Sequence, residues 1–245
     1  MFKSLLTSTL FIVLFSLSST YGDFDKLQLV LTWPPSFCHA NNCQRIVPKN
    51  FTIHGLWPDK EGPQLLKYCK PKLTYNYFSV SSFIIFFRTG SFSVLFNLLK
   101  SLFLNFLQDK MLNDLDKHWI QLKIDQASAR KDQPAWKYQY LKHGSCCQKI
   151  YNQNTYFSLA LRLKDRFDLL RTLQIHRIVP GSSYTFEEIF DAVKTVTQMD
   201  PDIKCTEGAP NLYEIGICFT PNGDSLVRCR QSETCDKTGK IFFRP

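Results

Sequence analysis

Acidic residues are scarce in this sequence of 245 residues. Asp and Glu together number 21 against 30 Lys and Arg, so the formal net charge at pH 7 is +9. A basic balance of this kind favours anionic partners such as nucleic acid, cell-wall acids or membrane surfaces. Internal repeats and low-complexity linkers are also missing. Their absence excludes a repeat architecture and predicts one domain with a real buried core.

The N-terminus has the pattern of a secretory signal peptide. Lys3 supplies the positive n-region, an interrupted apolar run extends from Leu5 to Leu17, and small residues precede Asp23. The run is short for a membrane span. We therefore expect a signal peptide over residues 1–22 and a secreted, extracellular chain over residues 23–245. A membrane anchor is the alternative.

The number of cysteines is odd, so they cannot all be paired in disulfides within the chain. All nine cysteines follow the signal peptide, so an oxidising compartment predicts disulfides and one leftover thiol. Cys38 and Cys43 are close enough in sequence to bridge each other. Asn50 begins the only N-x-S/T sequon, and glycosylation there fits secretion.

The hydrophobic pattern mixes two periods. Alternation at Leu27, Leu29 and Leu31 predicts a strand, and the run over residues 50–57 predicts another. Helical spacing predicts helices over residues 110–123, 135–147, 155–173 and 185–196, the last opening with a capping box. Residues 212–220 and 225–229 flank a Pro-Asn-Gly-Asp turn and predict a hairpin. Cys218 and Cys229 lie on its opposite strands and could pair, and Cys205 and Cys235 would then close an outer loop. The mixture predicts an α+β fold.

The stretch from Val80 to Gln108 does not fit this pattern. It is rich in Phe and Leu, lacks acids, and has only Arg88 and Lys100 as charges. A secreted disulfide-bonded domain has no obvious place for such an apolar patch. A/T-rich noncoding DNA tends to encode this composition, every Val codon begins with GT, and one Gln codon is CAG. We therefore hypothesise that residues 80–108 are a translated intron; a genuine apolar insertion and a membrane segment over 83–107 are the alternatives.

Two stretches have residues suited to acid–base chemistry. FTIHGLWPD places His54 at the end of a predicted strand, and WKYQYLKHGSCC places Gln139 and His143 on one face of a predicted helix beside Lys142. This set suits RNA cleavage through the 2′-hydroxyl. One imidazole removes a proton, the other protonates the leaving oxygen, and the cation stabilises the charge on phosphorus. Histidine, with a pKa of about 6.5, serves in either state, so the reaction requires no metal or cofactor.

These stretches resemble the two active-site segments of the T-two ribonuclease family. Together with LQLVLTWPPSFC, KHWIQL and the C-terminal cysteine hairpin, they are similar to the S-RNases, the stylar self-incompatibility ribonucleases of the nightshade family. The resemblance covers residues 23–245 except 80–108, about where genes of that family have a short intron. It implies a single disulfide-bonded α+β domain, with a twisted antiparallel sheet packed against several helices and a cleft over the sheet.

The resemblance also implies roles for the catalytic candidates. His143 would be the general base and His54 the general acid of the first step, and Lys142 would stabilise the transition state. Many relatives outside the S-RNases have His-Glu where this chain has Tyr138 and Gln139. Lys142 therefore lacks a carboxylate partner, and Gln139 can only exchange hydrogen bonds, which bears on the rate rather than the reaction type.

Further implied residues lie outside this catalytic set. Trp57 and Asp59 would help to form a base site, since an aromatic face stacks on a base, and Gln28 and Trp136 are further substrate-binding candidates. The implied disulfides are Cys38–Cys43, Cys69–Cys146, Cys205–Cys235 and Cys218–Cys229, which leaves Cys147 free.

We therefore expect a secreted, glycosylated and monomeric endoribonuclease that cleaves single-stranded RNA through a 2′,3′-cyclic phosphate. The resemblance implies that it is the stylar determinant of self-incompatibility and that it interacts with pollen-side recognition proteins of the F-box type. One alternative is a recognition protein with impaired catalysis, because Gln139 is uncharged. Others are a membrane-anchored protein using residues 83–107 and a stress-induced plant ribonuclease. The high pI and KHGSCC argue against the last.

Overall fold

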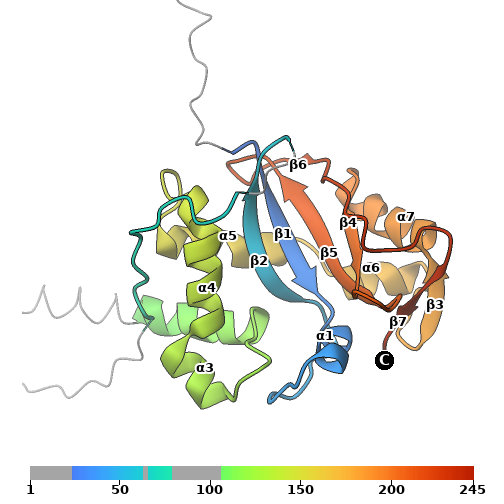
Figure 1. The fold of residues 1–245 in the computed structure, drawn as a ribbon, viewed down its shortest axis with the longest axis horizontal. Coiled ribbons are helices and arrows are strands. Elements are labelled where there is room, and N and C mark those ends of the chain that lie inside the picture. The colour runs from blue at the N-terminus through green and yellow to red at the C-terminus, as the bar shows by residue number, and fades with distance from the viewer. Residues whose placement is uncertain (1–23, 63–65, 79–105) are drawn as a thin grey trace, which may run out of the picture.

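The computed structural model describes residues 24–62, 66–78 and 106–245. Its centre is an antiparallel sheet of five strands in the order β2-β1-β5-β4, with β6 paired to β5 (Figure 1). A second sheet pairs β3 with β7. The strands are β1 (Lys26–Thr32), β2 (Thr52–Asp59), β3 (Ser182–Thr185), β4 (Asp202–Cys205), β5 (Leu212–Phe219), β6 (Leu226–Val227) and β7 (Lys240–Phe243).

Helices surround the central sheet. They are α1 (Pro34–Ala40), a helix through residues 106–118, α3 (Gln126–Asp132), α4 (Pro134–Lys142), a 3₁₀ turn (Gly144–Cys146), α5 (Gln153–Lys164), α6 (Leu169–Ile175) and α7 (Phe186–Thr197). Helices α3 and α4 lie beside β2, whereas α6 and α7 lie beyond β4 (Figure 1). The expected α+β fold, with an antiparallel sheet packed against several helices, is confirmed.

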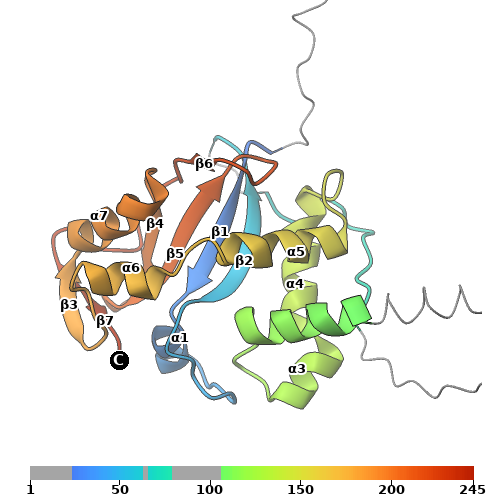
Figure 2. The same ribbon diagram turned by 180° about the vertical axis from the view of Figure 1, so that it is seen from behind.

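The strand period separates the two faces of the central sheet. One face has apolar side chains, among them Leu27, Leu29, Ile215 and Ile217. Helix α5 covers it (Figure 2), and Tyr156 donates a hydrogen bond of 2.8 Å to the carbonyl oxygen of Leu56. The opposite face has Gln28 and Thr32, which are four residues apart on β1, and their direct cross-strand partners Trp57 and Glu214. The polar face is therefore left for a functional site.

Several local predictions are confirmed and others are wrong. The first two strands, the C-terminal hairpin and the capping box at Thr185 are present. The single helix expected over 155–173 is two helices, because the Asp168 side chain accepts from the Arg171 backbone N–H and starts α6. The helix expected over 135–147 ends at Lys142, and the one expected over 110–123 ends at residue 118.

All four disulfides implied by the resemblance are present, and Cys147 is the free cysteine. Its thiol is buried, and this burial raises its pKa to about 12. A thiol held in its protonated form is a poor nucleophile. Cys147 is therefore part of the core rather than a reactive group.

Other predictions fall partly or wholly outside the described residues. The signal peptide over 1–22 lies outside them, as does the 80–108 stretch except for its last three residues. Two of those three, Phe106 and Leu107, are 64% and 43% exposed, although Leu112 one turn later is buried. Among the described residues, no helix has the length and apolar character to cross a membrane. Asn50, the expected glycosylation site, is exposed.

Candidate active site

His54 lies at a bulge in β2. Val30 of β1 pairs with Gly55 and Leu31 pairs with Ile53, so His54 is the extra residue between them. A bulge bends the strand and redirects the side chain of the extra residue. The His54 side chain is 37% exposed, and its Nδ1 contacts Oε1 of Glu214 on β5. The strand thus presents a partly exposed imidazole on the polar face of the sheet.

His143 comes from the other side, directly after α4. Its backbone N–H donates to the Gln139 carbonyl oxygen at 2.9 Å and so continues the helix by one bond. The side chain is buried, and Nδ1 has no hydrogen-bond partner within the described parts of the chain. Burial, followed by the charges of Lys142 and His54, lowers the pKa of His143 to about 3. The neutral form that a general base requires is therefore present throughout the neutral range.

This burial predicts how His143 titrates. The unfolded chain takes up this proton near its ordinary pKa of about 6.5, whereas the folded protein takes it up near 3. His143 therefore weakens the fold as pH falls through that window. We expect its C2-proton NMR resonance to stay at the neutral position from pH 8 to about pH 4.5. A midpoint near the ordinary value would contradict the buried environment.

Trp57 connects the two histidines. Its ring stacks on His143 with centroids 5.0 Å apart and meets His54 edge-on at 5.3 Å. Its Nε1 donates to Oε1 of the buried Gln139 at 3.0 Å. A Cβ on Gly55 would fall 2.2 Å from that Nε1, so only glycine leaves room for the bond. Trp57 and Gln139 therefore fix the spacing of the two imidazoles.

Two lysines lie close to the rings of Trp57 and the two histidines. Lys142 Nζ donates to the Tyr138 hydroxyl oxygen at 2.8 Å, and this bond lowers the pKa of Tyr138. Lys204 Nζ lies 4.6 Å from the centre of the Trp57 ring. Since His143 and Lys204 both contact Trp57, a nucleotide base can stack only on the part of the ring that they leave exposed.

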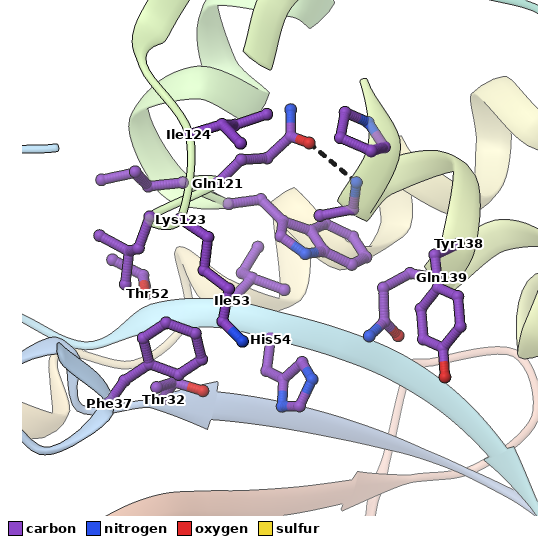
Figure 3. A pocket seen from close by; sticks show the side chains of 15 residues that line it. Thr32, Phe37, Thr52, Ile53, His54, Gln121, Lys123, Ile124, Tyr138 and Gln139 are labelled. Carbon is purple, nitrogen blue, oxygen red and sulfur yellow. Dashed lines mark hydrogen bonds between the residues drawn. The ribbon is translucent and has the colours of Figure 1, made fainter. Parts of the chain in front are cut away.

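Two cavities meet at His54. One, of about 440 Å³, is lined by both histidines together with Gln28, Trp57, Asp59, Lys142, Lys204 and Arg230. The other, of about 340 Å³, lies between β2, the segment over residues 119–124 and α4, and is lined by Phe37, Gln121, Lys123 and Ile124, among others (Figure 3). His54, Tyr138 and Gln139 line both. An extended ligand could therefore cross from one cavity to the other past His54.

Most of the expected site residues meet in this region. Gln28 lines the larger cavity and donates to Asp202 Oδ2 at 2.9 Å. Asp59 also lines it, but its carboxylate is nearly buried and lies 3.6 Å from Arg230. Trp136 is the exception, and its expected substrate contact is wrong. Its side chain is fully buried and donates to the Trp119 carbonyl oxygen at 2.7 Å.

The sequence analysis missed several residues of the site, among them Glu214, Lys204, Arg230 and Tyr138. The sequence contains one indication of Glu214: it is the only acidic residue in the otherwise largely apolar strand sequence LYEIGICF. Buried acids are rare unless paired, so this residue indicated a partner without identifying it. For metal binding, the described residues contain no cluster of three or more His, Cys, Asp or Glu side chains.

Two imidazoles, a lysine and an adjoining groove define a site for acid–base cleavage of a phosphodiester. The model of the Ribonuclease T2 family matches residues 24–229. Ribonuclease S-F11 of Nicotiana alata is 64% identical over 225 residues, covering 91% of this chain and 100% of that protein. Ribonuclease S-2 of Solanum tuberosum is 52% identical over the full length of both chains. The crystal structure of the Nicotiana alata self-incompatibility-associated SF11-RNase superposes with a TM-score of 0.75 at 63% identity, covering 91% of this chain and 100% of that one.

The chain therefore belongs to the ribonuclease T2 family and, within it, to the S-RNases. It is an endoribonuclease, and its substrate is RNA. Ribonuclease MC1 from the seeds of bitter gourd shares the fold at 24% identity and a TM-score of 0.64, covering 90% of this chain and 100% of that one.

Proposed function

We propose that the protein cleaves single-stranded RNA by transphosphorylation, with His143 as base and His54 as acid. One observation supports this assignment above all. Both imidazoles contact the same indole and line the same cavity as Lys142. General acid–base catalysis needs two such groups within reach of one phosphate.

The proposed first step transfers two protons: one from the 2′-hydroxyl to His143, and one from His54 to the leaving 5′-oxygen. Neutral His143 takes the proton of the 2′-hydroxyl, and the 2′-oxygen attacks phosphorus. The bond from phosphorus to the 5′-oxygen breaks, and protonated His54 donates a proton to that oxygen. Lys142 stabilises the negative charge on the non-bridging oxygens. The products are a 2′,3′-cyclic phosphate and a free 5′-hydroxyl, and hydrolysis of the cyclic phosphate would reverse the two roles.

The two cavities favour a substrate that extends on both sides of the cleaved bond. With the phosphate at His54, one nucleoside would enter the larger cavity and the next would enter the smaller one (Figure 3). Gln28 and the exposed part of Trp57 would contact the base in the larger cavity. Asp59 is engaged with Arg230, so its role there would be to hold that arginine.

The products and the requirements of the reaction test this proposal. An RNA oligonucleotide should yield 2′,3′-cyclic phosphate ends in the presence of excess EDTA, as read by mass spectrometry. The same oligonucleotide with one 2′-deoxy nucleotide should remain intact at that position, because it lacks the attacking oxygen. Linear 3′-phosphates without a cyclic precursor, or cleavage at the deoxy position, would refute the mechanism.

We further propose a secreted, monomeric glycoprotein that acts in the style as the self-incompatibility determinant and meets F-box-type proteins of pollen. Support comes from the S-RNase relatives, the basic charge and the exposed Asn50. Silencing the transcript in styles should end rejection of pollen of the same allele, and persistent rejection would refute the role. A catalytically impaired recognition protein is less favoured, because Gln139 has a defined contact with Trp57.

A further inference from the structure

A buried carboxylate lies directly behind His54. Glu214 sits in the middle of β5 and is 3% exposed. Its Oε1 contacts His54 Nδ1 and accepts a hydrogen bond of 3.3 Å from Thr32 Oγ1. The two-histidine mechanism gives this carboxylate no task. An isolated buried acid destabilises a fold unless it is neutralised or paired.

The pairing shows that this carboxylate is ionised. Lys204 Nζ lies 3.6 Å from Glu214 Oε2 and 3.6 Å from Asp202 Oδ2. Burial alone would raise the pKa of Glu214, but the charge and hydrogen bond of His54, with Lys204 and Thr32, lower it. Glu214 is therefore an anion held between an ammonium group and an imidazole.

The geometry has a direct consequence for His54. A carboxylate accepts and cannot donate, so the proton it meets belongs to Nδ1 of the imidazole. The contact leaves Nε2 as the nitrogen available to a ligand in the cavities that His54 lines. An anionic acceptor at one imidazole nitrogen fixes the tautomer and the ring orientation.

We propose that Glu214 is the positioning residue of His54: it holds the proton on Nδ1 and directs Nε2 toward the leaving 5′-oxygen, while Lys204 keeps Glu214 anionic. This inference rests on the proposed function, since it assumes that His54 is the acid. The proposal adds Glu214 to the residues that act with His54. Glu214 lies 160 residues further along the chain, on β5.

Other charged groups line the larger cavity beside His54, in addition to the Asp59 and Arg230 described above. They are Lys204 and Asp202 on β4, Lys142 and His143 at the end of α4, and Lys67 in the segment before Cys69. All of them remain when Glu214 alone is changed. A comparison of the native protein with a single variant therefore isolates the carboxylate.

The decisive variant is Glu214→Gln, which has nearly the same shape but no charge. We expect kcat to fall by about 10- to 100-fold with KM within about twofold. Glu214→Asp should recover part of the loss. Glu207→Gln, on the exposed turn between β4 and β5, is the matched control and should behave as the native protein.

A second measurement does not depend on any variant folding. The ¹⁵N chemical shifts of the neutral His54 ring in the native protein should show the proton on Nδ1. A proton on Nε2 would overturn the proposal, as would a Glu214→Gln enzyme with an unchanged kcat. If the native protein forms no cyclic phosphate, the proposed mechanism fails, while the ¹⁵N shifts still decide whether Glu214 orients the ring.

Discussion

Replacing His54 by Asn should lower kcat/KM for RNA by about 10³-fold and leave the folded structure intact. Asparagine can still accept or donate a hydrogen bond near Glu214, but it cannot transfer a proton. The His54 side chain is 37% exposed, so little packing is lost. Circular dichroism and thermal unfolding should match the native protein, whereas cleavage of a fluorogenic RNA should nearly vanish.

His143→Asn should lower kcat/KM by about the same factor. The double variant should have a kcat/KM little below that of either single variant. Groups that act as one unit are strongly non-additive, because removing the first leaves the second without its partner step. His39→Asn is the matched control, since His39 is exposed on α1 away from both cavities. Retention of a tenth or more of the activity by His54→Asn would reject its role as the acid.

The second large effect concerns the proposed translated intron. A chain that lacks residues 80–108 should give on the order of ten times more soluble, disulfide-bonded enzyme than the full sequence, because long apolar stretches with few charges promote aggregation. Phe78 and Gln108 line the same cavity as Met111, so the two flanks of the stretch lie close together. The described ends of the chain on either side of the stretch, at Phe78 and Gln108, therefore favour a chain that omits it.

The joined sequence also has the signals of a helix start. Ser79 would become the N-cap and Asp109 the first residue of the helix, where an acid favours the helix dipole. Phe78 and Leu112, both buried in one core cluster, would stand at the N′ and N4 positions of a hydrophobic staple. The buried Gln133 already accepts from the Phe78 backbone N–H at 3.1 Å, which anchors this flank.

Two measurements check this proposal. Sequenced stylar mRNA should pass from the Ser79 codon to the Asp109 codon. The shortened chain, refolded beside the full one, should form the same four disulfides and be at least as active. Mature transcripts that keep the 80–108 codons, or a shortened chain that fails to fold, would show that the stretch belongs to the protein.

Residues that act through local chemistry were predictable. His54 and His143 stand in short stretches whose neighbours are adjacent in sequence. That Gln28 and Trp57 share one face of the sheet was not predictable, because it depends on the pairing of β1 with β2. Trp136 was not predictable, because its place on α4 left open whether it faces the groove or the core. Packing against Trp119 decided that question.

Asp59 shows a similar limit. Its position after Trp57 suggested a contact with a base, but the carboxylate faces Arg230 from the C-terminal segment. Nothing in the local sequence contains that partner. Long-range charge pairs of this kind depend on which segments the fold brings together.

The amino-acid sequence by itself determined the reaction chemistry: two imidazoles, a lysine, and a basic chain with cysteines for four disulfides. Only the tertiary structure decided how these groups are tuned. Burial after α4 keeps the His143 imidazole neutral, a bulge in β2 exposes His54, and the pairing of β5 with β1 brings Glu214 behind it. Burial, register and charge proximity arise between residues far apart in sequence, so no local pattern encodes them.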